Sequence, residues 1–315
     1  MKRYNKLFEQ IISWQNFRLA FLKASKGKSR SSEVILFTTK LDENLEVLRH
    51  GIANQTYSIG EYRQFKIYDP KERIISVASF KDRVIHHAII NILEPIFEKQ
   101  FIFHTYACRK GKGTHAAARY VFKKARSNNF FLKLDIKKYF DSIDHTELKR
   151  QLIRIIKDKR CLILLFKIID SYYFQENKGL PIGNLTSQFF ANLYLSSLDH
   201  FILEQLKSAC YARYMDDMII LADSVQELKE ISHSIQMYIT QKLDLTLKEE
   251  IFGKISTGIP FLGWKITNNN VTVLSKTKKR MKKKLKEIQH DFLSGKITEE
   301  KAAERNNCVF NSRIV

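Results

Sequence analysis

The feature that most constrains the fold is an acidic pair, Asp216 and Asp217, between the two apolar arms of CYARYMDDMIILA at residues 210–222. Apolar and β-branched residues on both sides of the pair predict a β-hairpin with two carboxylates at its tip. A second apolar stretch, FFLKLDI at residues 130–136, predicts a short buried strand that ends on Asp135. Side chains at the ends of buried strands are exposed where the strands meet a cleft, so we expect the three carboxylates to converge.

Three converging carboxylates need a counter-charge, because they cannot all remain ionised without a cation. Mg²⁺ prefers carboxylate oxygens, waters and substrate phosphates as ligands. Two such ions about 4 Å apart activate an attacking hydroxyl and stabilise a leaving pyrophosphate. The pattern therefore indicates nucleotidyl transfer with two Mg²⁺ ions, for which Mn²⁺ is the expected substitute. A bare Asp-Asp pair in a hairpin is more often a solvated turn, so the rest of the chain must decide between the two interpretations.

The charge of the chain favours the first interpretation. The 315 residues have a formal net charge of +21, and a field of that strength attracts nucleic acid. The chain has no run of about 18 apolar residues, and its first ten residues lack the apolar centre of a signal peptide, so we expect no membrane partner. The four cysteines are scattered without a CxxC pair, and we interpret them as reduced thiols of a cytoplasmic protein: Cys108, Cys161, Cys210 and Cys308.

The other segments mix helical and strand periods and predict an α+β protein. The stretch YRQFKIYDPKERIISVAS alternates on both sides of Asp69 and Pro70, which predicts a hairpin with basic residues at its tip. Asp144 is expected to cap a helix, and a long helix is expected from Thr186 to Phe201. FLGWKI and NVTVLS are expected to form two short strands. Near the C-terminus, KTKKRMKKKLK predicts a helix with a basic outer face. Further helices are expected over residues 1–30, 33–57, 82–101 and 225–243.

The acidic hairpin is one of several blocks that resemble those of reverse transcriptases. YMDD is the signature of that family, and LKLDIKKYFDSIDH resembles its first catalytic block. KERIISVASFKDRVIHHAI and YACRKGKGTHAA resemble its fingers motifs, GLPIGNLTSQFFANLYL its nucleotide-pocket block, and FLGWKI its primer grip. The resemblance implies a right-hand polymerase fold, with fingers, a palm with an antiparallel sheet, and a short helical thumb. The expected domains are an N-terminal helical extension (1–60), fingers (61–130, with part of 150–180), palm (131–270) and thumb (271–315).

The resemblance also assigns roles position by position. The metal ligands would be Asp135, Asp216 and Asp217, which are also the catalytic residues, with the backbone of Ile136 close by. Phe140 would be the steric gate that excludes ribonucleotides, and Arg73 would clamp the triphosphate because arginine makes bidentate phosphate contacts. The other nucleotide-binding residues would be Lys66, Arg109, Ile182, Gly183 and Gln188. The primer grip would be Phe261, Leu262, Gly263 and Trp264, and the nucleic-acid-binding residues of the thumb would be Lys276, Lys278, Lys279, Arg280, Lys282 and Lys283.

One block narrows the family further. Most reverse transcriptases have QGxxxSP where this chain has IGNLTSQ, a form typical of diversity-generating retroelements of bacteria and phages. Such enzymes copy a template RNA into cDNA with errors at adenines, and a small basic protein assists them. A glutamine amide can hydrogen-bond around a nascent base pair, whereas Ile182 offers only dispersion contact. The expected partners are template RNA, cDNA, the RNA–DNA duplex, dNTPs, and either the small basic protein or a structured non-coding RNA.

Two alternative functions and one unassigned motif stay open at this point. An anti-phage defence reverse transcriptase that acts with a non-coding RNA shares much of the same core. A catalytically inactive, polymerase-like protein that only binds RNA would keep the fold. The block LTLKEEIFGKIS lacks the usual lysine close behind its leucines, and either Lys248 or Lys254 would have to replace it. Group II intron and retroviral enzymes fit less well, because the sequence has no room for their additional maturase, endonuclease or RNase H regions.

Overall fold

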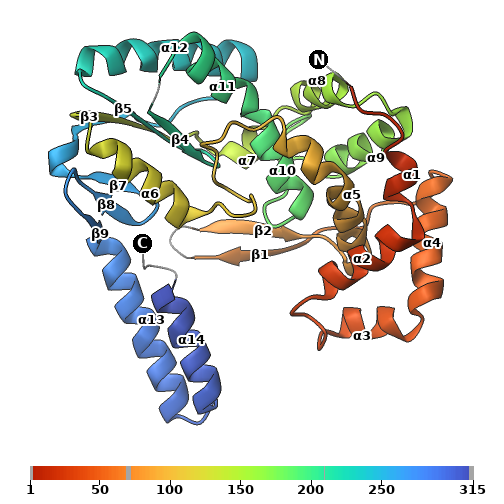
Figure 1. The fold of residues 1–315 in the computed structure, drawn as a ribbon. Coiled ribbons are helices and arrows are strands. Elements are labelled where there is room, and N and C mark those ends of the chain that lie inside the picture. Colours follow the sequence, from red (N-terminus) through yellow and green to blue (C-terminus); the bar gives the residue numbers. More distant parts are fainter. Residues whose placement is uncertain (1–2, 69–71, 209, 312–315) are drawn as a thin grey trace. The chain divides into compact units, whose positions relative to one another are not determined.

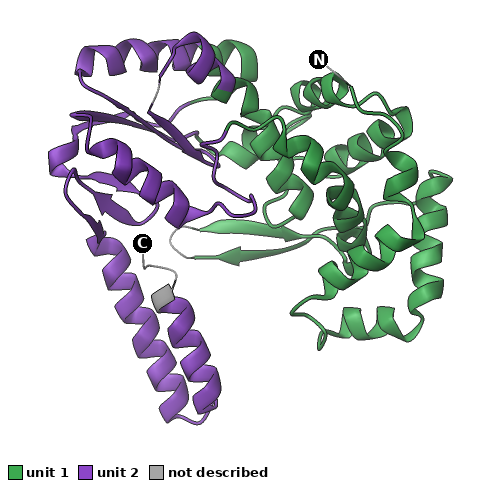
Figure 2. Ribbon diagram, viewed as in Figure 1, with its two compact units in different colours: residues 1–102, 137–199, 238–246 green, residues 103–136, 200–237, 247–315 purple. Residues whose placement is uncertain are grey.

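The computed structural model describes residues 3–68, 72–208 and 210–311, and the chain divides into two compact units (Figure 2). The first unit contains residues 1–102, 137–199 and 238–246, and the second contains residues 103–136, 200–237 and 247–315. Residues 1–60, expected to be a separate helical extension, fall within the first unit. Each unit thus combines segments that are distant in the sequence, and the division into fingers, palm and thumb stays a prediction.

The first unit is mainly helical and is organised around α5 (Phe80–Glu98), which packs against α2 and α10 (Figure 1). The Ser79 side chain caps α5 by accepting from the backbone N–H of Asp82. The predicted hairpin is present, with Arg63 paired to Val77, although Asp69 and Pro70 lie outside the described residues. The other elements are α1 (Phe8–Ile11), α2 (Trp14–Ser25), α3 (Ser32–Thr39), α4 (Leu41–Ala53), β1 (Arg63–Ile67), β2 (Arg73–Val77), α7 (Tyr139–Ser142), α8 (His145–Ile155), α9 (Lys159–Asp170) and α10 (Leu185–Tyr194).

The second unit is built on an antiparallel sheet with the strand order β4-β5-β3-β6. Its strands are β3 (Phe130–Leu134), β4 (Tyr211–Tyr214), β5 (Asp217–Ala222) and β6 (Ile251–Lys254). A smaller sheet of β7 (Ile259–Phe261), β8 (Trp264–Ile266) and β9 (Val271–Val273) lies nearby in the chain, after a 3₁₀ turn at Ile255–Thr257. Helix α6 (Thr114–Ala125) contacts strands of both sheets, and their apolar side chains form one core cluster with it.

The capped helix is confirmed, whereas two other expected elements differ. The Asp144 carboxylate accepts from the Glu147 backbone N–H at 2.8 Å, so α8 starts where predicted. The helix expected from Thr186 to Phe201 instead ends at Tyr194, and α11 (Ser196–His200) and a π-helical turn (Phe201–Gln205) follow it. Helix α12 (Val225–Leu243) forms as expected.

The segment FLGWKI is two strands and not one, which corrects the sequence prediction. Strand β7 ends at Phe261, β8 begins at Trp264, and these two residues are paired. Leu262 and Gly263 both have positive φ, 48° and 93°. Two consecutive residues with positive φ match the right-handed twist of a tight hairpin, so the chain reverses direction here.

The last described elements are a helical pair, α13 (Ser275–Leu293) and α14 (Glu299–Asn311), which pack along each other (Figure 1). Ile288 of α13 is buried with Ala302 and Val309 of α14. The buried face of α13 does not extend to Phe292, which remains 42% exposed. In the described part of the chain, no helix is both long enough and apolar enough to cross a membrane.

Candidate active site

The predicted carboxylates gather at one end of the central sheet. Strands β4 and β5 form the predicted hairpin, whose tip holds Asp216 and Asp217. Strand β3 runs antiparallel to β5, and Leu134 at its end is paired with Met218. Asp135 is the next residue along, so this register brings it beside Asp217. The two central strands of the sheet therefore present their acidic ends together.

The carboxylates influence one another's charge. Burial, together with the charges of Asp135 and Asp217, raises the pKa of Asp216 to about 6, while Lys248 opposes the rise. A carboxyl group that is largely buried beside two others holds its proton more tightly because its ionised form is poorly solvated and repelled. The site therefore has an excess of negative charge that favours a bound cation.

Two lysines partly balance this negative charge. The Lys248 Nζ lies 2.6 Å from Asp135 Oδ1, and its backbone N–H also donates to the Asp135 carbonyl. The Lys133 Nζ lies 3.2 Å from Asp217 Oδ1. Lys254 pairs with Phe130 at the opposite end of β3, so Lys248 is the lysine at the carboxylates. Sequence reasoning missed Lys133, although strand alternation places it on the same face as Asp135, two residues on.

The chemistry of the three carboxylates suits divalent cations, although they lie near one another without forming a complete ligand group. Among the described residues, no three His, Cys, Asp or Glu side chains already converge as a metal-binding group. Carboxylate oxygens are the ligands that Mg²⁺ prefers, and a positive ammonium group already sits on both Asp135 and Asp217. The residues that would hold such ions are Asp135, Asp216 and Asp217. The predicted backbone neighbour, Ile136, is fully buried and bridges to Leu247.

Most of the predicted nucleotide-binding residues belong to the first unit, around the turn at residues 179–184. The backbone N–H of Leu180 donates to the Phe140 carbonyl at 2.8 Å. The backbone N–H of Ser76, on β2, donates to the Ile182 carbonyl, also at 2.8 Å. The turn is thus tied on one side to α7 and on the other to the hairpin.

The glycine of this turn allows its close approach to the hairpin. Gly183 has a φ of 116°, and a Cβ there would lie 2.8 Å from Ile75 Cγ2. Arg73 is two residues before Ile75, so strand alternation places both on the face of β2 that meets the turn. Gln188 is half-buried on α10, and its N–H donates to the Asn184 carbonyl. The structure therefore groups Arg73, Gly183 and their neighbours in one place.

Asn184 is a residue of this group that sequence reasoning did not single out. Its buried side chain accepts from the Ala78 N–H at 3.2 Å and donates to the Ser76 carbonyl at 3.1 Å. These bonds join the start of α10 to the end of β2. An asparagine directly before a helix is a local signal of capping, but its long-range partners leave no trace in the sequence.

Lys66 and Arg109 are placed differently from Arg73. Lys66 pairs across the hairpin with Ile74, which puts it on the opposite face from Arg73, and its Nζ binds Glu72 at 2.7 Å. Arg109 belongs to the second unit, where its guanidinium donates to the Thr105 carbonyl at 2.9 Å. Of the predicted basic clamp residues, Arg73 is therefore the one that the hairpin brings to the turn.

The predicted primer grip divides into core and surface. Phe261 and Trp264 are fully buried, and Trp264 lies edge-on to His115 with ring centroids 5.2 Å apart. Leu262 and Gly263 form the turn between β7 and β8 and are half-buried. Within this segment, the turn at Leu262 and Gly263 is the part that can present its backbone to a ligand. The two aromatic residues hold the turn in place.

The predicted basic residues of the C-terminal region lie on α13. All of them except Arg280, which is half-buried, are exposed: Lys276, Lys278, Lys279, Lys282 and Lys283. A helix with this distribution offers a row of cations to a polyanion.

A mixed fold of helices around an antiparallel sheet, with carboxylates where its two central strands meet, is consistent with a right-hand polymerase. Residues 68–266 match the family model "Reverse transcriptase (RNA-dependent DNA polymerase)". The chain belongs to the reverse transcriptase family.

Known proteins agree with this assignment. The chain is similar to the group II intron-encoded protein LtrA of Lactococcus lactis subsp. cremoris, with 26% identity over 74% of this chain and 41% of that protein. It is also similar to an uncharacterized 91 kDa protein in a cob intron of Schizosaccharomyces pombe (34% over 44% and 18%) and to the protein YkfC of Escherichia coli (22% over 73% and 73%). The chain thus spans less than half of the two intron proteins.

Solved structures agree on the fold. An apo telomerase from Candida tropicalis, truncated from its C-terminal domain, aligns with a TM-score of 0.53 at 15% identity, over 70% of this chain and 55% of that one. Telomerase from Candida albicans aligns with a TM-score of 0.52 at 13% identity, over 76% and 52%. At this level of identity the likeness concerns the right-hand fold alone.

Proposed function

We propose that the protein is an RNA-directed DNA polymerase that makes cDNA by two-metal nucleotidyl transfer. The observation that supports this proposal is the position of Asp135, Asp216 and Asp217 on adjoining ends of β3 and β5, within the region that matches the family. The ligands would be an RNA template, a growing cDNA strand and dNTPs.

Each group of site residues has its own role in the proposed reaction. The carboxylates of Asp135, Asp216 and Asp217 would hold the cations, in place of the ammonium groups of Lys133 and Lys248 that now pair with Asp217 and Asp135. Two bound divalent ions would supply activation of the 3′-hydroxyl and neutralisation of the leaving pyrophosphate. Arg73 holds the triphosphate, Phe140 restricts the sugar, and the hydrogen-bonded turn keeps Ile182 and Gly183 in register with β2.

Primer extension on an RNA template tests this activity. Wild-type protein with Mg²⁺ is expected to extend a DNA primer, and Asp216→Ala is expected to show no product because an essential cation ligand is missing. The affinity for RNA should change less than twofold in the variant, because the substitution removes a carboxylate and leaves every basic side chain in place. An RNA-binding wild type that extends no primer on any template would instead identify an inactive, polymerase-like protein.

We further propose that the enzyme is of the diversity-generating retroelement type, with low fidelity at template adenines. Ile182 supports this because its backbone carbonyl is fixed by Ser76 while its apolar side chain offers no hydrogen bond to a base pair. Loss of one polar check on pairing geometry costs about 1–3 kcal/mol, enough for a tens-fold loss of selectivity. A small basic protein would be the partner.

Sequencing of cDNA from wild type and Ile182→Gln tests this second step. The wild type is expected to misincorporate mainly opposite adenines, and the glutamine variant to reduce those errors about tenfold or more. Errors spread evenly over all four template bases would remove the retroelement assignment and leave a defence role with a non-coding RNA, while the polymerase assignment would stand.

A further inference from the structure

One buried histidine lies against the turn at residues 179–184 without being part of it. His145 is the first residue of α8 and is 3% exposed. Its Nε2 atom lies 2.7 Å from the carbonyl oxygen of Gly179. A carbonyl oxygen can only accept, so the ring carries a hydrogen on Nε2 and donates it to Gly179. The proposed function described above gives this side chain no role.

The peptide group that His145 holds is also bonded on its other side. The Gly179 carbonyl and the Leu180 N–H belong to one planar peptide unit. That N–H donates to the Phe140 carbonyl at 2.8 Å. The oxygen and the hydrogen of a trans peptide point in opposite directions, so His145 and Phe140 bind it from opposite sides. His145 therefore fixes the plane of the peptide that joins Phe140 to the turn.

The main chain next to this peptide is tied to the start of α8. The backbone N–H of His145 donates to the Asn177 carbonyl at 2.9 Å. The backbone N–H of Gly179 donates to the Ile143 carbonyl, also at 2.9 Å. Gly179 has a φ of 112°, and a Cβ there would lie 2.8 Å from the Phe174 nitrogen. A glycine has more backbone freedom than other residues, so a side-chain bond to its carbonyl restricts the turn at its most mobile peptide.

A second contact sets the orientation of the His145 ring. Its Nδ1 lies 3.4 Å from Asp170 Oδ1. A half-turn of the ring would put carbon atoms at both contacts, so the two contacts together select one orientation. The same carboxylate accepts from the Lys149 Nζ at 2.6 and 2.7 Å. Asp170 is 50% exposed, so solvent screens its charge and its main effect is to orient the ring.

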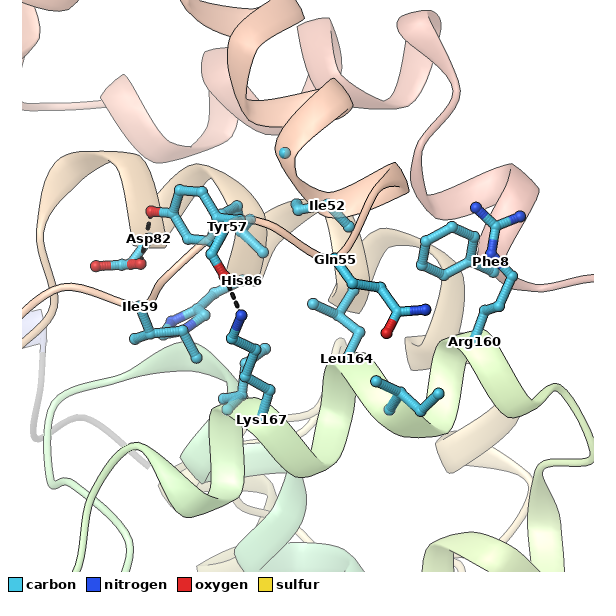
Figure 3. Close-up of a pocket in the computed structure, with 14 residues that line it drawn as sticks. Phe8, Ile52, Gln55, Tyr57, Ile59, Asp82, His86, Arg160, Leu164 and Lys167 are labelled. Atoms are coloured by element: carbon cyan, nitrogen blue, oxygen red, sulfur yellow. Dashed lines mark hydrogen bonds between the residues drawn. The ribbon is translucent and has the colours of Figure 1, made fainter.

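Helix α9, which ends at Asp170, is itself anchored (Figure 3). Lys167, three residues before Asp170, donates to the Tyr57 carbonyl. The Tyr57 hydroxyl donates in turn to Asp82 of α5 at 2.8 Å. Helix α9 also packs against α8, and all of these residues belong to the first unit. The carboxylate that orients His145 is therefore carried by a helix with several contacts of its own.

We propose that His145 is a positioning residue of the polymerase reaction, which keeps the turn and Phe140 at the spacing that the sugar of an incoming nucleotide requires. The proposal rests on the proposed function, in which Phe140 restricts the sugar. His145 acts through the Gly179 carbonyl and touches no reacting atom. Loss of its hydrogen bond would let the peptide rotate, and the site would then exclude ribonucleotides less well.

Two amide variants separate the hydrogen bond from the packing of the ring. His145→Gln places an amide N–H near the position of Nε2, whereas the amide of His145→Asn is one methylene shorter and reaches only the position of Nδ1. Hydrogen exchange of the backbone amides in 179–184, measured by mass spectrometry on the full chain, should be about tenfold faster in the asparagine variant. The glutamine variant should stay within about twofold of wild type. Equal exchange in the two variants would overturn the proposal.

Primer extension on an RNA template measures the consequence for specificity. The ratio of kcat/KM for dNTP to that for rNTP should fall about tenfold in His145→Asn. Its KM for dNTP should rise, while kcat at saturating dNTP stays within about twofold of wild type. The glutamine variant should restore the ratio. A purely structural histidine would change the amount of active enzyme and leave the ratio unchanged, and that result would refute the proposal.

A control and a second variant complete the test. Ile155→Ala removes buried packing from the other end of α8 and should keep the wild-type ratio despite lost stability. If melting curves show that His145→Asn does not fold, Asp170→Ala decides, because the Asp170 side chain is exposed. That variant should speed exchange of the turn about threefold, and unchanged exchange would overturn the proposal. If the wild type extends no primer, the polymerase proposal fails, while hydrogen exchange still decides whether His145 holds the turn.

Discussion

Lys133 and Lys248 stabilise the negative charge of the carboxylates when no divalent cation is bound. The Lys248–Asp135 pair has side chains that are 40% and 30% exposed, so solvent screens it and its contribution is small. The Lys133–Asp217 pair is less exposed, at 20% and 30%. Both ammonium groups occupy positions that compete with divalent cations.

Lys248→Met should therefore change the response to metal. Without metal the variant should be less stable than wild type by about 1 kcal/mol or less, because Asp135 loses its partner beside Asp216. Added Mg²⁺ should raise its melting temperature more than it raises that of the wild type, since no ammonium has to be displaced. Thermal melts in EDTA and in Mg²⁺ measure this. Lys254→Met is the control, because Lys254 lies on β6 opposite the far end of β3, and this variant should respond as wild type does.

Asp158 is a second residue with a measurable electrostatic role. Its carboxylate accepts from the Leu7, Phe8 and Cys161 backbone N–H groups at 2.8, 2.9 and 3.1 Å. Burial alone would raise the pKa of Asp158, yet these backbone bonds hold it below the ordinary value. The side chain caps α9 and ties the start of the chain to it.

Asp158→Ala should destabilise the protein by about 1–2 kcal/mol at pH 7, the usual loss for a helix cap. Because the folded-state pKa is lowered, the ionised carboxylate stabilises the fold above its unfolded pKa of about 4. This stabilisation is lost as the pH falls through the folded-state value, so the difference between wild type and variant should shrink there. Urea unfolding at pH 7 and pH 3 measures both differences, and a constant difference would contradict the role of the charge.

At the scale of elements, the turn at residues 179–184 connects α7, β2 and α10. It has two main-chain bonds to neighbouring elements, through Leu180 and Ile182, and side-chain bonds through Asn184. No apolar pattern specifies such a turn. Its conformation depends on a glycine with positive φ that passes against the hairpin.

Gly183→Ala should disturb this turn. The left-handed conformation costs a residue with a Cβ about 1–2 kcal/mol, and the new methyl would meet Ile75 at 2.8 Å. We expect a loss of about 2 kcal/mol or more in unfolding free energy, together with a higher KM for dNTP as Arg73 shifts. Gly295→Ala is matched for positive φ but meets nothing within 4 Å, so it should lose less stability and keep its KM. Equal losses in both variants would remove the contact with Ile75 from the explanation.

At the scale of the whole molecule, charge is the dominant property. Eight of the eleven residues between 276 and 286 are Lys or Arg, within a total of +21. They lie on α13, whose other side packs against α14. Core packing therefore orders the helix while its lysines stay in solvent.

Neutralising part of this row should weaken the salt dependence of RNA binding. Each phosphate contact contributes about 0.9 to the slope of log K against log salt. Lys278→Gln with Lys282→Gln should lower the slope for an RNA–DNA duplex by about 1 to 2. Lys229→Gln with Lys242→Gln, exposed on α12, removes the same charge and should leave the slope nearly unchanged. Titrations at four salt concentrations measure it, and equal slope changes would show only a general effect of charge.

The elements that sequence predicted well have strong local patterns. The acidic hairpin, the strand before Asp135 and the Asp144 cap depend on alternation or on a side chain three residues away, and all three are confirmed. The prediction of a single strand for FLGWKI was wrong because its apolar residues fit one strand as well as two. The prediction of one long helix was wrong because the apolar pattern in the sequence continues past Leu195, whereas helix α10 does not.

The sequence by itself determined the family, the carboxylates and the basic C-terminal helix, because strand ends, motifs and charge runs are local properties of the chain. Only the tertiary structure decided which cations sit on those carboxylates, since Lys248 is 113 residues from Asp135. The same holds for the turn at residues 179–184, whose main-chain bonds to Phe140 and Ser76 join segments that are distant in the sequence. Contacts of this kind depend on side-chain geometry between distant segments, and no periodicity in the sequence records them.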